Sequence, residues 1–264
     1  MPFQTHEKNG LVWLTSDILG CVRHGFSTRR GGVSAPPWDT LNLGISRGDD
    51  PACVAGNYRR FCAVIGVDAD RCVLSRQVHE DNVRLVTAAD CGKGLLRERD
   101  YTSVDAMICC EKDVPLVVFS ADCNVILLYD PVRGAVGAVH AGWRGTALGI
   151  AARTVRSMAE SFGCDPADIR AAIGPAIGKC CFETDDDVPE ALRAALGDAV
   201  EPFMERRGAK WHIDLRAVNA LWLRREGVEQ AEISDHCTAC RPDLYWSHRK
   251  TGNARGSQAA VICL

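Results

Sequence analysis

The 264-residue sequence has no apolar run long enough to cross a membrane and no excess of basic residues. Its longest apolar stretches, residues 114–123 and 124–129, are far shorter than the roughly 20 residues that a membrane-spanning helix needs. The first ten residues are polar, unlike a signal peptide, which needs an apolar centre. The net charge is -3, whereas general nucleic-acid binders present a basic surface. We therefore expect a cytoplasmic protein that binds neither membranes nor nucleic acid.

Paired histidines and the common nucleotide-binding fingerprints are also missing. The seven histidines include no His-x-His pair, although multicopper oxidases hold several copper ions with many such histidines. Neither a Walker loop nor a dinucleotide-binding fingerprint is present. The sequence therefore argues against a multicopper oxidase and against both of these nucleotide-binding types.

Cysteine, in contrast, is abundant, with fourteen residues spread along the chain. In a reducing compartment most of them are expected to be small buried apolar side chains. Cys237 and Cys240 form a Cys-x-x-Cys motif between His236 and His248, and Cys180-Cys181 forms a second pair. Such a motif is compatible with structural zinc, with redox chemistry or with inert thiols, and the sequence leaves these alternatives open.

Short apolar runs and amphipathic segments alternate without a regular βαβ repeat, which predicts an α/β fold with mixed β-sheets flanked by helices. The length suits a single compact domain spanning residues 1–264. The expected strands are residues 21–28, 105–110, 115–119, 124–129, 135–140, 169–173, 233–235, 244–247 and 259–264, with extended structure over 71–86. The expected helices are residues 50–64, 147–162, 185–196 and 214–225.

Three polar residues, His79, Cys123 and His140, lie at the ends of apolar segments. Proteins of the α/β class place their chemistry at strand ends. Two imidazoles and a thiolate suit a catalytic zinc ion, whose fourth ligand is a water of lowered pKa. Asp122 and His24 are candidates for supporting the ligands or moving protons. Two alternatives remain open. The three residues could be a core cysteine and two hydrogen-bonded histidines without a metal, or the site of a metal-free hydrolase with Cys123 as nucleophile and His140 as base.

Two loops join arginine to glycine, at residues 29–32 and 142–145. Arginine binds phosphate with two parallel hydrogen bonds, and glycine lets backbone N–H groups approach an anion. Arg30 and Arg144 are therefore candidates for binding an anion such as phosphate or carboxylate, with Gly145 and Thr146 at the N-terminus of the helix expected over 147–162. Ordinary turns carrying surface arginines would give the same pattern.

The chain resembles the family of bacterial YfiH- and YlmD-type proteins and human FAMIN, described as laccase domain-containing proteins, polyphenol oxidases and purine nucleoside phosphorylases. The resemblance rests on motifs that follow in order along nearly the whole chain. They are HGFSTRRGGVS (24–34), LNLG (41–44), RQVHEDNV (76–83), FSADCNVILLYDP (119–131), AVHAGWRGT (138–146), AAIGPAIGKCCFE (171–183), DHCTAC (235–240) and WSHRKTGNARGSQAAVI (246–262).

The resemblance implies that His79, Cys123 and His140 are metal ligands, with zinc as the cofactor and copper accepted in vitro. It implies a compact α/β fold similar to that of certain bacterial toxin deamidases. It also implies phosphorolysis of adenosine, inosine or methylthioadenosine, and hydrolytic deamination of adenosine. Polyphenol oxidation would then be an adventitious activity. The expected partners are a small-molecule nucleoside and phosphate, with Arg30, Asn42, Arg144 and His24 contacting substrate, in a protein expected to be a monomer.

Other functions remain open. Some bacterial members of the family are implicated in peptidoglycan editing, as amidases that remove a wrongly incorporated L-serine from a UDP-linked muropeptide precursor. A binding module without catalysis is a further alternative. Two departures from the family pattern, Glu80 after the histidine of QVH and Asn124 after the cysteine of ADC, remove no ligand but are expected to reshape the pocket.

Overall fold

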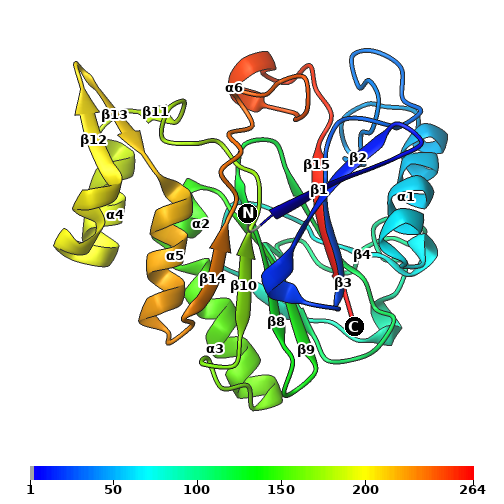
Figure 1. Cartoon of the computed structure of the whole chain (residues 1–264), viewed down its shortest axis with the longest axis horizontal. Coiled ribbons are helices and arrows are strands. Elements are labelled where there is room, and N and C mark those ends of the chain that lie inside the picture. The colour runs from blue at the N-terminus through cyan, green and yellow to red at the C-terminus, as the bar shows by residue number, and fades with distance from the viewer. Residues whose placement is uncertain (1–2) are drawn as a thin grey trace.

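The computed structural model describes residues 3–264, in which two six-stranded sheets face each other and helices cover their outer faces (Figure 1). The first sheet has the order β1-β2-β3-β15-β7-β4 and the second the order β14-β10-β8-β9-β6-β5. Both sheets are mixed: the β4–β7, β5–β6 and β10–β14 pairs are parallel, and the other pairs are antiparallel. The predicted α/β fold with mixed sheets is confirmed.

The strand bounds are as follows. The first sheet contains β1 (Phe3–Lys8), β2 (Leu11–Ser16), β3 (Arg23–Ser27), β4 (Val73–Leu74), β7 (Leu116–Ser120) and β15 (Gln258–Cys263). The second contains β5 (Val83–Leu85), β6 (Ala106–Cys109), β8 (Asn124–Asp130), β9 (Ala135–Ala141), β10 (Arg170–Ile173) and β14 (Gln230–Ile233). A third, three-stranded sheet contains β11 (Glu183–Thr184), β12 (Met204–Arg207) and β13 (Lys210–Ile213).

The helices are α1 (Pro51–Ile65), α2 (Trp143–Ala147), α3 (Ile150–Phe162), α4 (Asp187–Leu196), α5 (Leu215–Arg225) and α6 (His248–Thr251). Short 3-10 segments lie at Asp17–Leu19, Ala69–Arg71, Ala88–Asp90 and Gly197–Phe203. None of the helices within residues 3–264 has the length and apolar character needed to cross a bilayer.

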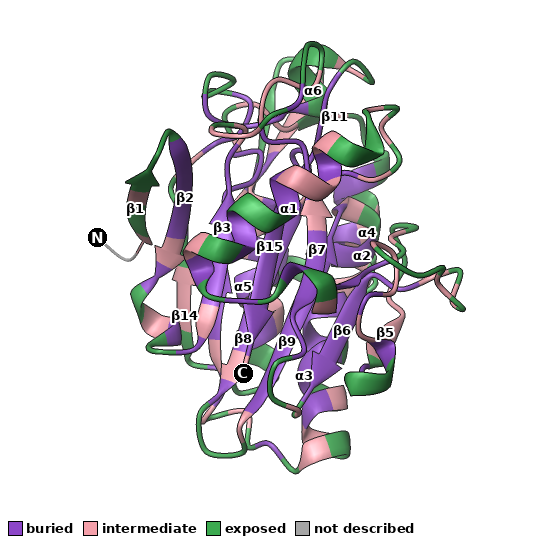
Figure 2. Ribbon diagram, turned by 90° about the vertical axis from the view of Figure 1, so that its right-hand side faces the viewer, coloured by how far each residue is buried: buried purple, intermediate pink, exposed green. Residues whose placement is uncertain are grey.

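The main core lies between the two large sheets. Phe26 and Leu116 of the first sheet pack in one buried cluster with Val125 and Leu127 of the second. Helix α1 covers the outer face of the first sheet, and α3 and α5 cover that of the second, so that the central strands are buried on both sides (Figure 2). This two-sided burial is why the central strands read as continuous apolar runs.

Capping residues fix where two predicted helices begin. The Asp50 carboxylate accepts a hydrogen bond from the N–H of Ala52, and α1 ends at Gly66 in the left-handed conformation. The Asp214 carboxylate accepts from the N–H groups of Arg216 and Ala217 at the start of α5. These caps satisfy N–H groups that have no partner inside the helix.

The helix expected over 147–162 was wrong at its start. The structure has two helices there, because Gly149 adopts a φ of +77° and separates α2 from α3. A side chain at position 149 would also approach the Trp222 ring to 3.3 Å. Gly145 and Thr146 therefore lie inside α2 and not at the N-terminus of a long helix.

Three further expectations differ from the structure. Residues 244–247 form a buried loop instead of a strand, because the N–H of Trp246 binds the side chain of Gln258. The strand expected over 233–235 lies earlier, at β14. Extended structure over 71–86 is limited to β4 and β5, with a loop between them. The β12–β13 hairpin was not predicted, since its residues are mostly polar and only Met204 and Ile213 are buried.

Candidate metal centre

The structure brings His79, Cys123 and His140 together at one place where the two large sheets meet. His79 lies on the connection from β4 to β5, and Cys123 on the turn from β7 to β8, so both belong to crossings between the sheets. His140 lies near the end of β9. One possible ligand atom from each residue lies within 4.8 Å of the others, and the two imidazole rings stand edge to face with centroids 4.8 Å apart.

Asp105 holds two of these residues in position. Its carboxylate accepts hydrogen bonds from the backbone N–H groups of Val78 (2.9 Å), His79 (3.0 Å) and Glu80 (3.2 Å). It also accepts from Nδ1 of His140 at 2.8 Å. Nδ1 of His140 therefore carries the proton, and Nε2 is left to bind a metal, as in many zinc sites.

Sequence reasoning did not identify Asp105 as functional. The available signal was a carboxylate at the start of an otherwise apolar segment, which needs a partner when it is buried. The partners come from a distant loop and from β9, so only the folded chain reveals them.

The trio and Asp105 are electrostatically coupled. Burial disfavours the charged form of His140, but the Cys123 sulfur and the Asp105 carboxylate outweigh it and raise the pKa of His140 to about 9. Burial also opposes ionisation of Asp105, yet the hydrogen bonds from His140 and Val78 lower the pKa of its carboxyl. Loss of hydration, followed by the neighbouring His140, lowers the pKa of His79.

The backbone around the trio is unusual. His79 and Asp122 adopt φ values of +66° and +91°, which L residues rarely do. Such conformations persist where the surroundings determine them strongly, and they are common at functional sites. The Gly142 backbone also lies close to the trio. A Cβ at this position would lie 2.5 Å from Nδ1 of His79 and 3.4 Å from Sγ of Cys123, so only glycine fits there.

The Asp122 carboxylate is fully engaged with the protein. It accepts hydrogen bonds from the hydroxyls of Thr238 (2.6 Å) and Ser247 (3.0 Å), and from the N–H of Arg249 (2.7 Å). These bonds fix the turn that presents Cys123. Of the two roles expected for Asp122 from the sequence, these bonds favour support of the ligand over proton transfer.

The trio opens into a cavity of about 430 Å³. One part of its lining is apolar and aromatic, with Phe119, Trp143 and Phe182. Another part is cationic, with Arg47, Arg144, Arg249 and Arg255, and His248 lies on the same lining. The cavity therefore combines flat apolar surfaces with a concentration of positive charge, which suits a ligand that has a planar ring and an anionic group.

Arg255 is the most notable of these cations, because only 7 % of it is exposed. Desolvation, followed by the charge of Arg47, lowers the pKa of its guanidinium to about 10. Its NH1 group donates to the carbonyl of Gly256 at 2.9 Å, but Nε has no partner within residues 3–264. A buried guanidinium with a free donor in a cavity is a candidate anion site. The sequence places Arg255 in the motif at 246–262 but gives no signal of this role, because its burial depends on the tertiary fold.

Of the four residues expected to contact substrate, only Arg144 lines this cavity. Arg30 is exposed and lines a separate depression beside Arg29 and Asp39. The Gly31 and Gly32 N–H groups both donate to Oγ1 of Thr40, at 3.1 and 3.0 Å, and so are not free to bind an anion. The expectation that Arg30 joins the trio at one site is therefore not met.

His24 and Asn42 are buried elsewhere. His24 accepts a hydrogen bond from the N–H of Ser16 at 2.9 Å and contacts the Val22 carbonyl at 2.8 Å. Asn42 accepts from the N–H groups of Gly44 and Ser257, both at 2.9 Å. Since Ser257 lines the cavity, Asn42 supports the cavity wall without facing the cavity itself.

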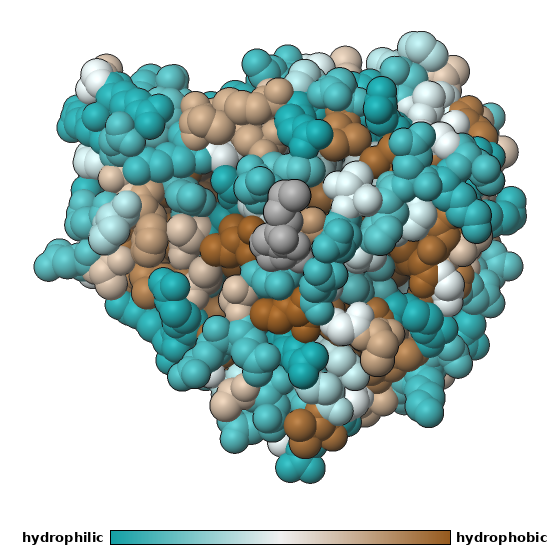
Figure 3. Space-filling view, in the orientation of Figure 1, coloured by the Kyte–Doolittle hydropathy of each residue, from teal (hydrophilic) through white to brown (hydrophobic). Residues whose placement is uncertain are grey.

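One face of the molecule bears on the alternative of a binding module. The face in Figure 3 is mainly hydrophilic, with apolar side chains in small separate groups. The large exposed apolar residues, among them Val33, Leu96 and Val132, lie far apart in the chain. A second group of four possible metal ligands, Cys180, Cys181, Cys237 and Cys240, lies beside the cavity.

Comparison with known proteins gives consistent relationships over almost the whole chain. Purine nucleoside phosphorylase YlmD of Geobacillus stearothermophilus is 37% identical over 267 residues, covering 98% of this chain and 96% of that protein. The protein of the same name from Bacillus subtilis is 36% identical over 244 residues, covering 90% of this chain and 87% of that protein. The crystal structure of the Bacillus licheniformis hypothetical protein YfiH superposes with a TM-score of 0.92 at 34% identity, covering 100% of this chain and 99% of that one.

The sequence profile of one family matches residues 23–264, which include every residue of the trio and of the cavity lining. Together with the identities above, this match shows that the chain belongs to the family described as multi-copper polyphenol oxidoreductase laccase, as its motifs predicted.

Proposed function

We propose that the protein is a zinc-dependent purine nucleoside enzyme that cleaves adenosine, inosine or methylthioadenosine with phosphate and also deaminates adenosine hydrolytically. The observation that carries the proposal is the cavity that joins the His/Cys/His trio to aromatic walls and to four arginines, of which Arg255 is buried, Arg47 is half-buried and Arg144 and Arg249 are exposed. The names of the YlmD relatives support the phosphorylase activity.

His79, Cys123 and His140 fit a zinc ion by their chemistry. Two nitrogens and one sulfur are typical zinc donors, Asp105 orients His140, and Gly142 leaves the space between His79 and Cys123 clear. When bound, the ion would supply Lewis acidity and lower the pKa of water. This set of three ligands is typical of a catalytic and not a structural zinc site.

For phosphorolysis, the protein has to bring phosphate and nucleoside together. Arg255, with Arg47 and Arg249 along the same lining, would hold the phosphate. A phosphate oxygen forms the new bond to the ribose C1′, the bond from C1′ to the purine nitrogen breaks, and the purine takes up a proton. Trp143 and Phe182 would stack against or pack beside the base. Holding both reactants in one orientation accounts for much of the rate of such reactions.

His248 is the candidate for the proton that the purine receives. It lines the cavity, and its Nδ1 lies 3.0 Å from the Gly252 carbonyl, to which it donates. This bond fixes the ring and leaves Nε2 free to exchange a proton. Asp122 lacks that freedom, because three donors already occupy its carboxylate.

The test is to incubate purified protein with each nucleoside, with and without phosphate. We expect adenine and ribose 1-phosphate from adenosine only when phosphate is present, and inosine in either case. Absence of all three products at any zinc loading would contradict the proposal.

Arg255→Met tests the phosphate site. Hydrogen bonds to charged groups contribute about 1.5–3 kcal/mol, so we expect phosphorolysis to fall roughly ten- to hundredfold, mainly through the KM for phosphate. Deamination should fall much less. Arg30→Met is the matched control, because Arg30 lies in a separate depression, and it should leave both activities unchanged. Equal losses of both activities in Arg255→Met would argue against a specific phosphate contact.

A metal-free hydrolase is the second candidate, favoured by the Asp105–His140–Cys123 arrangement. In this mechanism Cys123 would attack substrate and His140 would accept its proton. Metal analysis separates the two proposals. Full activity in metal-free protein, lost on thiol alkylation, would support the hydrolase, whereas activity that requires zinc and disappears in His79→Ala supports the nucleoside enzyme.

A further inference from the structure

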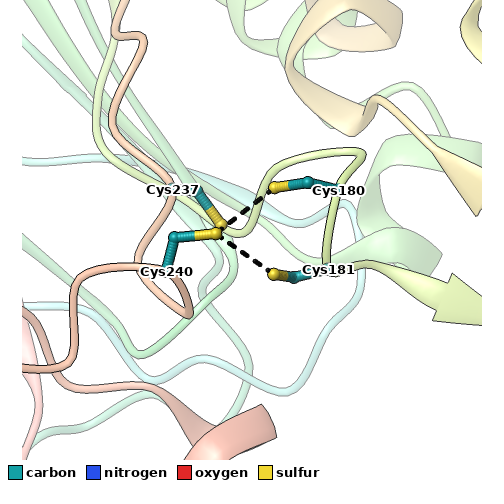
Figure 4. A group of neighbouring side chains, drawn as sticks. All are labelled: Cys180, Cys181, Cys237 and Cys240. Atoms are coloured by element: carbon teal, nitrogen blue, oxygen red, sulfur yellow. Dashed lines mark hydrogen bonds between the residues drawn. The ribbon is translucent and has the colours of Figure 1, made fainter.

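Four cysteines outside the trio converge at the wall of the cavity. Cys180 and Cys181 lie in a tight turn after β10, closed by bonds from the N–H groups of Cys181 and Phe182 to the Gly178 carbonyl, both 2.9 Å. Cys237 and Cys240 lie in the loop after β14. Figure 4 shows the four side chains pointing toward one another from the two loops.

The sulfur atoms are closely grouped. Sγ of Cys240 lies 3.5 Å from Sγ of Cys180 and 3.4 Å from Sγ of Cys181, and all four sulfurs lie within 4.8 Å of one another. Four sulfurs at about 2.3 Å from a tetrahedral zinc ion would be about 3.8 Å apart. The observed spacing needs only a small adjustment to reach that geometry.

Contacts other than those among the four sulfurs also hold the two loops together. Ala176 and Cys237 form a parallel bridge, and the N–H of Thr238 donates to the Ala176 carbonyl at 3.1 Å. The N–H of Gly178 donates to Sγ of Cys237 at 3.2 Å. An N–H group directed at a sulfur stabilises thiolate, which is the form that binds metal.

We propose that Cys180, Cys181, Cys237 and Cys240 bind a second zinc ion as four thiolates, separate from the ion held by His79, Cys123 and His140. Binding releases the protons of the four thiols and leaves a net charge of -2 at the site. The Arg216 guanidinium lies near the site and would offset part of this charge. A Cβ added at Gly178 would be 3.0 Å from NH2 of Arg216 and 3.3 Å from Sγ of Cys180. Soft thiolate donors in a tetrahedral set select zinc over harder cations.

A disulfide explains the cluster less well. Cys240 is almost equidistant from Cys180 and Cys181, so the geometry selects neither as its partner. Any single disulfide would also leave two thiols in the cluster without a role. The Cys62–Cys72 contact differs, because it joins two sulfurs at 3.7 Å in the core, and no group of three or more possible metal ligands within residues 3–264 includes it.

The second ion would brace the cavity. Ile177 and Phe182, on either side of the cysteine pair, line the cavity, and Arg249 donates to the Cys181 carbonyl at 2.9 Å. Thr238, between the other two cysteines, donates to Asp122 next to Cys123. The four-cysteine site therefore connects to the turn that presents a ligand of the first site, and it acts by positioning.

The test is the zinc content of protein purified without added metal and without oxygen, measured by elemental mass spectrometry. We expect two zinc ions per chain in the wild type, one in Cys240→Ser and one in Cys123→Ser. Cys110→Ser is the control, because Cys110 is exposed and lies outside both groups, and it should keep two. One ion per chain in the wild type, lost in Cys123→Ser, would overturn the proposal.

Cobalt substitution provides a second measurement if Cys240→Ser does not fold. In cobalt-loaded Cys123→Ser we expect the strong sulfur-to-metal absorption of a tetrathiolate site to remain. The trio cannot be its source, because this variant lacks Cys123, the only thiolate of the trio. Disappearance of that absorption would overturn the proposal. So would a disulfide from Cys240 to Cys180 or Cys181 in the anaerobic preparation.

Discussion

Asp105 connects the trio to the rest of the fold at the scale of single residues. One buried carboxylate accepts three backbone N–H groups and the Nδ1 proton of His140. Because those donors come from a loop and a strand distant in sequence, the residue determines both the path of the His79 loop and the tautomer of His140.

Replacement of Asp105 by asparagine should weaken zinc binding roughly ten- to hundredfold, as is typical when the partner of a ligating histidine is lost. The amide directs a donor at N–H groups that need an acceptor. Competition with a zinc chelator would measure the change. Asp81→Asn is the control, because Asp81 lies in the same loop as His79 but forms an ion pair with Arg153 at the surface. Equal affinity in wild type and Asp105→Asn would show that this carboxylate does not orient the ligand.

Zinc affinity should also rise with pH. In the metal-free protein the pKa of His140 is raised to about 9, so the ring is protonated below that pH and zinc has to displace the proton. Deprotonation of His140 by itself should therefore increase the zinc affinity by about tenfold per pH unit up to about pH 9, and its effect should level off above that pH. Chelator competition at pH 7, 8 and 9 would measure this, and a constant affinity over the range would contradict it.

The same shift affects stability without metal. The pKa of His140 in the folded chain lies above its unfolded value of 6.5. Its contribution to the free energy of unfolding is then fully present below pH 6.5 and is lost as the pH rises through about 9.

At the scale of elements, α5 both covers the second sheet and contributes to the wall of the cavity. Leu215 at its start lines the cavity, and the Asn219 amide donates to Oγ1 of Thr146 in α2 at 3.0 Å. Helix α2 carries Trp143 and Arg144, so the position of α5 affects one wall of the site.

Asp214→Ala tests the start of α5. Two N–H groups lose their acceptor, and loss of such a cap costs about 0.5–2 kcal/mol of stability. Chemical denaturation would show the loss as a lower midpoint with an unchanged slope. Asp214→Asn is the matched comparison, because asparagine is also a good cap and should retain most of the stability. A full loss in Asp214→Asn would point to the charge and not to the cap.

At the scale of the whole molecule, the trio lies where the two sheets meet. His79 and Cys123 belong to connections between the sheets, and His140 belongs to the second sheet. A metal bound there joins chain segments that would separate on unfolding, so binding and folding are coupled.

Removal of metal should therefore lower the melting temperature. A ligand that binds only the folded chain adds about 2.7 kcal/mol when its free concentration is a hundred times Kd. Scanning calorimetry of zinc-loaded and chelator-treated protein would measure the difference. The stabilisation by zinc should be smaller in Cys123→Ser than in the wild type, and equal stabilisation in both would place the effect at other residues.

Much of the fold could be predicted because burial leaves a local signature. Strands β6 to β9 are apolar on both faces, so each appeared as a short continuous apolar run, and the acidic caps of α1 and α5 marked where those helices begin. The break at Gly149 left no such signature, because a single glycine is tolerated within a helical pattern. The organisation as a single domain stays a prediction, as do the monomeric state and the peptidoglycan-editing alternative.

The sequence by itself determined the class of fold, the family and the three polar residues at strand ends, since residue type and local periodicity carry that information. Only the tertiary structure decided which polar residues meet. It placed Asp105 and Arg255 beside the trio, moved Arg30 and His24 away from it, and brought Cys180-Cys181 to Cys237 and Cys240 across about sixty positions. The physical reason is that the pairing of β10 with β14 and the crossings between the sheets are contacts between distant segments, which no local pattern of residues specifies.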